Sequence, residues 1–163
     1  RLPSTLYKGG SMGSQITAVI HYLSLLLLFA LLGSEHILIN RPLNARRVRR
    51  LLIIDIAYGT SASLVLFSGA AWVLWYGQGL NDYLYNSLFQ IKVGLFLLVG
   101  ALATLPTLAL LNWRTALLAK QAPDISQRLR HWVTLCIRLE LLLLLIILLL
   151  SGLMADDFGA LKQ

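Results

Sequence analysis

Residues 132–154 read WVTLCIRLELLLLLIILLLSGLM, a stretch in which Arg138 and Glu140 are the only charged side chains. As an α-helix at 1.5 Å per residue, this stretch is about 35 Å long. A lipid hydrocarbon core needs about 20 apolar residues in a helix. A strand is excluded, because the run shows no alternation and an open sheet leaves backbone groups unpaired in lipid. The stretch therefore predicts a transmembrane helix.

Three further apolar blocks of similar length lie at about 16–39, 51–76 and 88–111. Of the 163 residues, 58% are hydrophobic and 13% are charged, about half the charged share of a soluble domain. This composition excludes a soluble enzyme, a disordered chain and a secreted disulfide scaffold, and the single cysteine, Cys136, has no partner. We predict an all-α fold, an integral membrane four-helix bundle that forms a single domain from residue 12 to residue 163.

Residues 1–11 have a different character from the rest of the chain. Leu6-Tyr7-Lys8 is followed by Gly9-Gly10-Ser11 and then by Met12, and Leu-Tyr-Lys resembles the end of a green fluorescent protein. We interpret residues 1–11 as a linker from a fusion protein and leave them out of the functional reasoning.

The net charge of +7 indicates how the protein is oriented in the membrane and does not indicate a nucleic-acid partner. The basic residues gather in the connections between the first and second and between the third and fourth spans: Arg41, Arg46, Arg47, Arg49, Arg50, Arg114, Lys120, Arg128 and Arg130. Because cytoplasmic loops are enriched in lysine and arginine, both connections are predicted to face the cytoplasm and both termini to lie outside. The lipid bilayer is then the partner that the composition implies.

Ionisable residues inside the predicted spans are costly in lipid and so mark a site or a structural cluster. Their depth follows from the predicted orientation. His21 and Lys92 fall in the outer half, and the others fall in the inner half: Glu35, His36, Asp55, Arg138 and Glu140.

In the outer half, His21 is a candidate metal ligand, because a neutral imidazole within a helical bundle is a common axial ligand of haem iron. The alternative is a buried histidine that a serine or tyrosine satisfies. Lys92 is a candidate cofactor-binding or catalytic residue: it could pair with a propionate, act as a second ligand or transfer protons. Its alternative is to extend its ammonium group to the outer headgroups.

In the inner half, Arg138 with Glu35, Asp55 or Glu140 could form a neutralising structural charge cluster. The alternative is a carboxylate relay for protons, with Glu35 and Asp55 as catalytic residues. A stripe of mostly small residues also begins at Asp55 and continues with Gly59, Ala62, Leu66 and Gly69, which predicts close contact with another helix.

The layout resembles a small family of predicted membrane proteins of bacteria, including cyanobacteria, whose function is not established. The resemblance rests on five pieces: His21-Tyr22-Leu23 through Glu35, Arg46-Arg47 through Asp55-Ile56-Ala57-Tyr58-Gly59, Phe89-Gln90-Ile91-Lys92, Arg138-Leu139-Glu140, and Leu153-Met154-Ala155 before Phe158-Gly159. It implies a multi-pass protein of the bacterial cytoplasmic (inner) membrane or the cyanobacterial thylakoid. The chain departs from the family's usual ending at Asp156-Asp157.

More distantly, the same pattern is similar to the HemJ-type protoporphyrinogen oxidases, four-helix membrane proteins that bind haem b. In that family a histidine on the first helix and a lysine on the third are functional, and the matching positions here are His21 and Lys92. The resemblance implies haem b as cofactor and a porphyrin as ligand. Gln90 stands where that family has a second histidine.

Three functional hypotheses follow. The first is a haem-b-binding or porphyrin-handling membrane oxidoreductase that resembles protoporphyrinogen oxidase. The second is a non-enzymatic bundle that assists assembly of a partner complex. The third is a small proton-coupled carrier, which at this size is expected to act as a homodimer.

Overall fold

A computed structural model describes residues 12–76, 83–119 and 126–160, with side chains up to residue 153. It contains four long helices, α1 (Met12–Ile39), α2 (Ala45–Ala71), α4 (Ser87–Leu118) and α5 (Gln127–Ala160). A π-helical turn, η1 (Trp72–Tyr76), continues α2. No strand occurs in these ranges, so the predicted all-α four-helix fold is confirmed. The predicted linker, residues 1–11, lies outside the described residues.

α2, α4 and α5 extend beyond the predicted apolar blocks at the ends that carry the arginines. Asn44 caps α2, because its side chain accepts a hydrogen bond from the backbone N–H of Arg47 at 3.0 Å. Arg46, Arg47, Arg49 and Arg50 therefore lie in the first turns of α2 rather than in the connection. With 27 to 34 residues per long helix, the helices are about 40–51 Å long and exceed a hydrocarbon core of about 30 Å.

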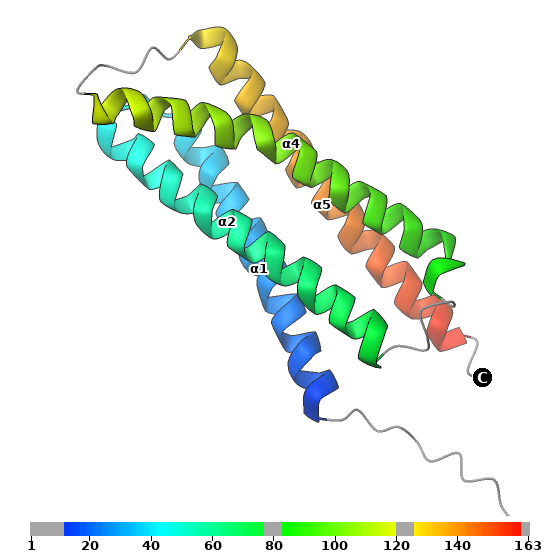
Figure 1. Ribbon diagram of the computed structural model, residues 1–163. Coiled ribbons are helices and arrows are strands. Elements are labelled where there is room, and N and C mark those ends of the chain that lie inside the picture. The colour runs from blue at the N-terminus through cyan, green and yellow to red at the C-terminus, as the bar shows by residue number, and fades with distance from the viewer. Residues whose placement is uncertain (1–11, 77–82, 120–125, 161–163) are drawn as a thin grey trace, which may run out of the picture.

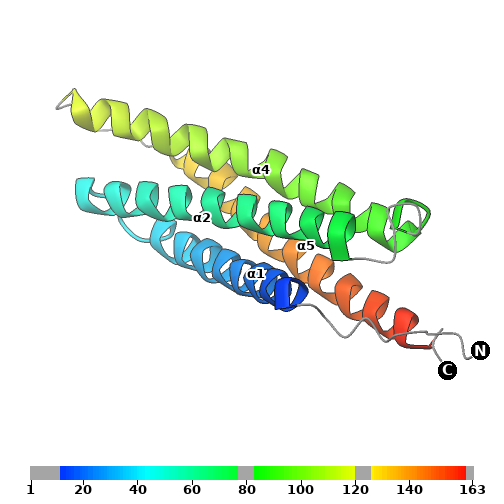
Figure 2. The same ribbon diagram turned by 60° about the horizontal axis from the view of Figure 1, so that its bottom comes forward.

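The four helices form a ring in the order α1, α2, α4, α5. The packing is most extensive between α1 and α2 and between α4 and α5, so the bundle consists of two helical hairpins. The seams between the hairpins, α2 against α4 and α1 against α5, are less extensive. Figure 2 shows α2 between α4 and α1, with α5 behind. α2 and α5 thus face each other across the centre of the ring.

Eight arginines lie on segments that meet at one end of the bundle (Figure 1). There the connection between α1 and α2 lies beside the end of α4 and the start of α5. We call this the basic end, defined by Arg41, Arg46, Arg47, Arg49, Arg50, Arg114, Arg128 and Arg130. The start of α1 and the end of α5 both lie at the opposite end (Figure 1).

Leucine, isoleucine and valine from all four helices fill the centre of the ring; among them, Leu28, Leu51, Leu110 and Leu144 are fully buried. In the most apolar 18-residue stretch of each helix, only 22% to 39% of the residues are buried inside the protein. Such extensive apolar surface is incompatible with water and matches lipid. The protein is therefore a multi-pass membrane protein.

Candidate functional site

Two glutamate side chains lie in the apolar centre of the bundle. Glu35 of α1 is 2% exposed and Glu140 of α5 is 1% exposed. Each keeps one oxygen, Oε1, buried without a hydrogen-bond partner. Buried polar atoms are nearly always hydrogen-bonded in folded proteins, so two buried carboxyl oxygens without a partner indicate a candidate functional site.

Tyr58 of α2 supplies the main polar contact of Glu140. Its hydroxyl donates a hydrogen bond to Oε2 of Glu140 at 2.9 Å, and the tyrosine is itself 5% exposed. Because α2 and α5 are not neighbours in the ring, this bond crosses the centre of the bundle. It joins the two hairpins from inside.

Asp55, one turn before Tyr58 on α2, is half-buried on the side that faces α4. Its Oδ1 accepts a hydrogen bond from the Thr107 hydroxyl of α4 at 2.9 Å. Glu35 interacts electrostatically with both Asp55 and Glu140. We call Glu35, Asp55 and Glu140, with their donors Tyr58 and Thr107, the acid cluster; all four helices contribute to it.

A cavity of about 200 Å³ lies beside the acid cluster in the seam between α2 and α4. Asp55, Tyr58 and Thr107 provide its polar wall, and small residues of both helices provide much of the rest: Gly59, Ala62, Gly100 and Ala103. A Cβ atom added at Gly59 would meet nothing within 4 Å. The prediction that this stripe makes close helix contact is therefore wrong at Gly59, where the missing side chain leaves space.

The structure does not bring Arg138 into the acid cluster. Arg138 is exposed, whereas Glu140 is buried, because two helical positions differ by about 200° around the axis. Within the described part of the chain, Arg138 forms no ion pair with Glu35, Asp55 or Glu140. The same ranges hold no group of three or more histidine, cysteine or acidic side chains placed to bind a metal ion.

His21 packs on α2 toward the opposite end of the bundle. Its Nδ1 lies 3.1 Å from the carbonyl oxygen of Val65 and 3.0 Å from the hydroxyl of Ser68. A carbonyl oxygen only accepts, so Nδ1 carries the hydrogen and a neutral His21 keeps its lone pair on Nε2. The contact with Ser68 agrees with the alternative of a histidine satisfied by a serine; the role of His21 as a metal ligand stays a prediction, with Nε2 as the ring atom that would serve it.

Gly69 allows this position of the imidazole, since a Cβ there would lie 3.3 Å from Cε1 of His21. Lys92 of α4 is half-buried and interacts electrostatically with His21. Their helices, α1 and α4, are not neighbours in the ring, and among the described residues no hydrogen bond joins the two side chains. Neither His21 nor Lys92 lines the 200 Å³ cavity.

Sequence reasoning missed Tyr58 and Thr107 as members of the site. Tyr58 follows Asp55 by three residues, which places both on one helical face, and this spacing is the signal that could have revealed it. Thr107 lies on another helix, directly after Pro106, and this position does not indicate a contact with Asp55.

Comparison with known proteins agrees with the fold. No curated protein and no solved structure gives a significant match. The sequence model of one family, described as predicted membrane protein (DUF2214), matches residues 13–159. This match covers all four helices almost from end to end. The chain therefore belongs to the DUF2214 family of predicted membrane proteins.

Proposed function

We propose that the protein is a small proton-coupled membrane carrier, in which the acid cluster takes up and releases the protons. The observation that carries this proposal is the meeting of Glu35, Asp55 and Glu140 inside the bundle without an ion pair among the described residues. If these three positions served stability alone, leucine would stabilise the bundle interior better than a carboxyl group does.

The chemistry of the cluster supports proton exchange. An ionised carboxylate buried without a cation is far less stable than the protonated acid. Glu35 and Glu140 each lack a donor for one oxygen, so a proton is the simplest group that neutralises them. Because Glu35 interacts with both other acids, a negative charge on one carboxyl group disfavours a negative charge on the next.

The cavity beside Asp55 supplies a place for a small transported molecule. Its walls are mostly apolar, and its polar groups are the carboxyl of Asp55 and the hydroxyls of Tyr58 and Thr107. A molecule in this space meets the member of the cluster that is least buried. Protonation of Asp55 and occupation of the cavity are thereby linked.

The test is proton flux in liposomes that hold the purified protein and a trapped pH-sensitive dye, driven by a potassium gradient with valinomycin. Asp55→Asn and Glu140→Gln keep the side-chain shapes, and we expect each to lower the flux about tenfold or more, since an essential proton-transfer group is lost. Thr60→Val is the matched control, because Thr60 is exposed on α2 and bonds only to Ile56. Unchanged flux in both acid variants contradicts the proposal and favours the non-enzymatic assembly bundle.

A second candidate function, haem binding in an oxidoreductase, is favoured by the tautomer of His21. Nδ1 bonded to the Val65 carbonyl is the arrangement that orients a histidine for metal ligation through Nε2. His21 would hold the iron of haem b, and Lys92 would pair with a propionate. When bound, haem supplies one-electron chemistry.

This candidate predicts a Soret absorption band in protein purified in mild detergent from haem-supplied cells. His21→Ala removes the band, and His36→Gln, a substitution elsewhere on α1, keeps it. A colourless protein that does not bind added haemin contradicts haem binding. This result does not bear on the proposal of a proton-coupled carrier.

We propose that the basic end faces the cytoplasm, so that both termini lie outside, in the inner membrane of a bacterium or in a thylakoid. Cys136→Ser gives a background without cysteine. In that background, Tyr85→Cys is expected to react with a membrane-impermeant maleimide in intact cells, and Thr115→Cys only after lysis. The reverse pattern contradicts the orientation.

A further inference from the structure

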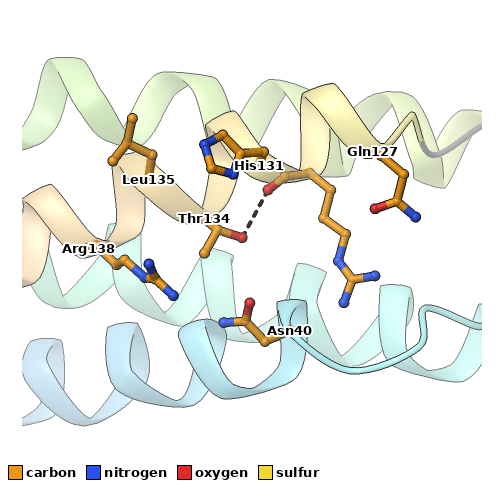
Figure 3. Close-up of a pocket in the computed structure, with 7 residues that line it drawn as sticks. Asn40, Gln127, His131, Thr134, Leu135 and Arg138 are labelled. Atoms are coloured by element: carbon orange, nitrogen blue, oxygen red, sulfur yellow. Dashed lines mark hydrogen bonds between the residues drawn. The ribbon is translucent and has the colours of Figure 1, made fainter.

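A second cavity, of about 290 Å³, lies at the basic end in the seam between α1 and α5. Asn40 follows the end of α1 and contributes one wall; the first turns of α5 contribute the other. Figure 3 shows Arg138 and Asn40 pointing into the space between the two helices. The acid cluster and the cavity beside Asp55 share none of these lining residues.

Hydrogen-bond donors and positive charge dominate the lining of this cavity. Arg130 and Arg138 bring guanidinium groups, Asn40 and Gln127 bring amides, and His131 brings an imidazole. Among the residues that the structure describes, no aspartate or glutamate lines the space. Such a lining repels cations and suits an anion that accepts several hydrogen bonds at once.

Arg130 makes one wall of the cavity rigid. Its Nε donates to the carbonyl oxygen of Ile39 at 2.9 Å, and a terminal nitrogen donates to the carbonyl oxygen of Arg41 at 3.1 Å. These bonds fasten the end of α1 to α5. The guanidinium charge is not neutralised by them, because both acceptors are uncharged.

Arg138 is the residue of this cavity whose charge most needs a counter-ion. It lies in the apolar segment Gln127–Leu153 of α5, about 16 Å from the start of the helix. An arginine does not lose its proton in a protein, and a charge near lipid is costly without a counter-ion. Within the described residues Arg138 has no hydrogen bond or ion pair. The described part of the chain therefore gives Arg138 no counter-ion, and an anion bound in the cavity would supply one.

We propose that this cavity binds a phosphate group, held between Arg138 and the donors of Asn40, Gln127 and His131. Phosphate oxygens match the fork of donors on a guanidinium group and the charge of the cavity. Two sources carry this group at a membrane surface, the headgroup of an anionic lipid and free phosphate. Leu135 in the lining and Trp132, exposed beside it, suit the glycerol and acyl chains of a lipid.

The experiment measures the thermal stability of the detergent-purified protein with added ligands, and the lipids that remain bound in native mass spectrometry. The ligands are phosphatidylglycerol, phosphatidylcholine and inorganic phosphate. Stabilisation by phosphatidylglycerol but not by the other two identifies a lipid headgroup, and stabilisation by inorganic phosphate identifies free phosphate; either result supports the site.

Arg138→Gln is expected to weaken the binding of the effective ligand about tenfold, since one charge-assisted contact is lost. Arg138→Lys restores part of it. Arg114→Gln is the matched control, because Arg114 is an exposed arginine of the basic end that does not line the cavity. Equal binding by the Arg138→Gln and Arg114→Gln variants, equal effects of the two lipids, or no stabilisation by any ligand overturns the proposal. None of these outcomes depends on the proton flux.

Discussion

Tyr58 and Glu140 are hydrogen-bonded across the centre of a ring of helices in which their own helices are not neighbours. The bond joins the first hairpin to the second in a bundle interior that is mostly leucine, isoleucine and valine, with Glu35 and Asp55 close by. In an apolar centre, a single polar contact of this kind decides which faces of the helices point inward, because every other pairing leaves a carboxyl group unsatisfied.

Tyr58→Phe removes this bond and leaves both oxygens of Glu140 without a donor. We expect the free energy of unfolding to fall by about 1–3 kcal/mol, the cost of a buried unpaired polar group. Unfolding by SDS in mixed micelles measures the loss. Tyr22→Phe is the control, since Tyr22 is 65% exposed. An equal loss in the two variants would show that the bond contributes nothing particular.

Asp55 and Thr107 form the second contact between the hairpins. A double-mutant cycle with Asp55→Ala and Thr107→Val is expected to give a coupling free energy of about 0.5–1.5 kcal/mol. The matched cycle uses Thr104→Val, one turn earlier on α4, whose hydroxyl bonds to Ala101 in its own helix. The prediction fails if Thr104 couples to Asp55 as strongly as Thr107 does.

Gly69 and Gly59 lie on one stripe of α2 and give opposite predictions. Gly69→Ala places a methyl group 3.3 Å from Cε1 of His21, so the ring must move and weaken its bond to the Val65 carbonyl. Gly59→Ala meets no atom and gains about 0.5–1 kcal/mol of helix preference. We expect a lower melting temperature for Gly69→Ala and an equal or higher one for Gly59→Ala. A gain in both variants would argue against the contact between His21 and α2.

Arg130 satisfies carbonyl groups at the end of α1 that the helix itself leaves unpaired. Arg130→Gln is expected to speed amide hydrogen exchange in the segment 38–44, measured by mass spectrometry. Arg128→Gln, an exposed arginine two residues earlier, should leave exchange there unchanged. Similar exchange in both variants would mean that other contacts hold the end of α1.

The number and type of the helices could be predicted because a membrane requires a long apolar run for each crossing. Their ends could not be read in the same way. Arginine is a good helix former, and the cap at Asn44 lets α2 begin before the apolar block that starts at Leu51. The apolar run therefore marks the part of the helix inside lipid, whereas the helix itself is longer.

The members of the acid cluster were predictable as inner-half ionisable residues, but their partners were not. α5 is apolar on all sides around Glu140, so its sequence does not indicate which face turns inward. Charge alone favoured Arg138 as the partner of the carboxyl groups. The rotation of α5 in the bundle instead turns Glu140 toward Tyr58 and Arg138 outward, and this rotation depends on the packing of all four helices.

The division into two hairpins also has a consequence for biosynthesis. Each hairpin pairs two consecutive helices closely, so each can enter the membrane as soon as its own two segments have been synthesised. The bonds of Tyr58, Thr107 and Arg130 all join one hairpin to the other. Between insertion of the first hairpin and arrival of the second, Asp55 lacks its donor Thr107 and Tyr58 lacks its acceptor Glu140. The first hairpin by itself is therefore expected to be less stable than the complete bundle.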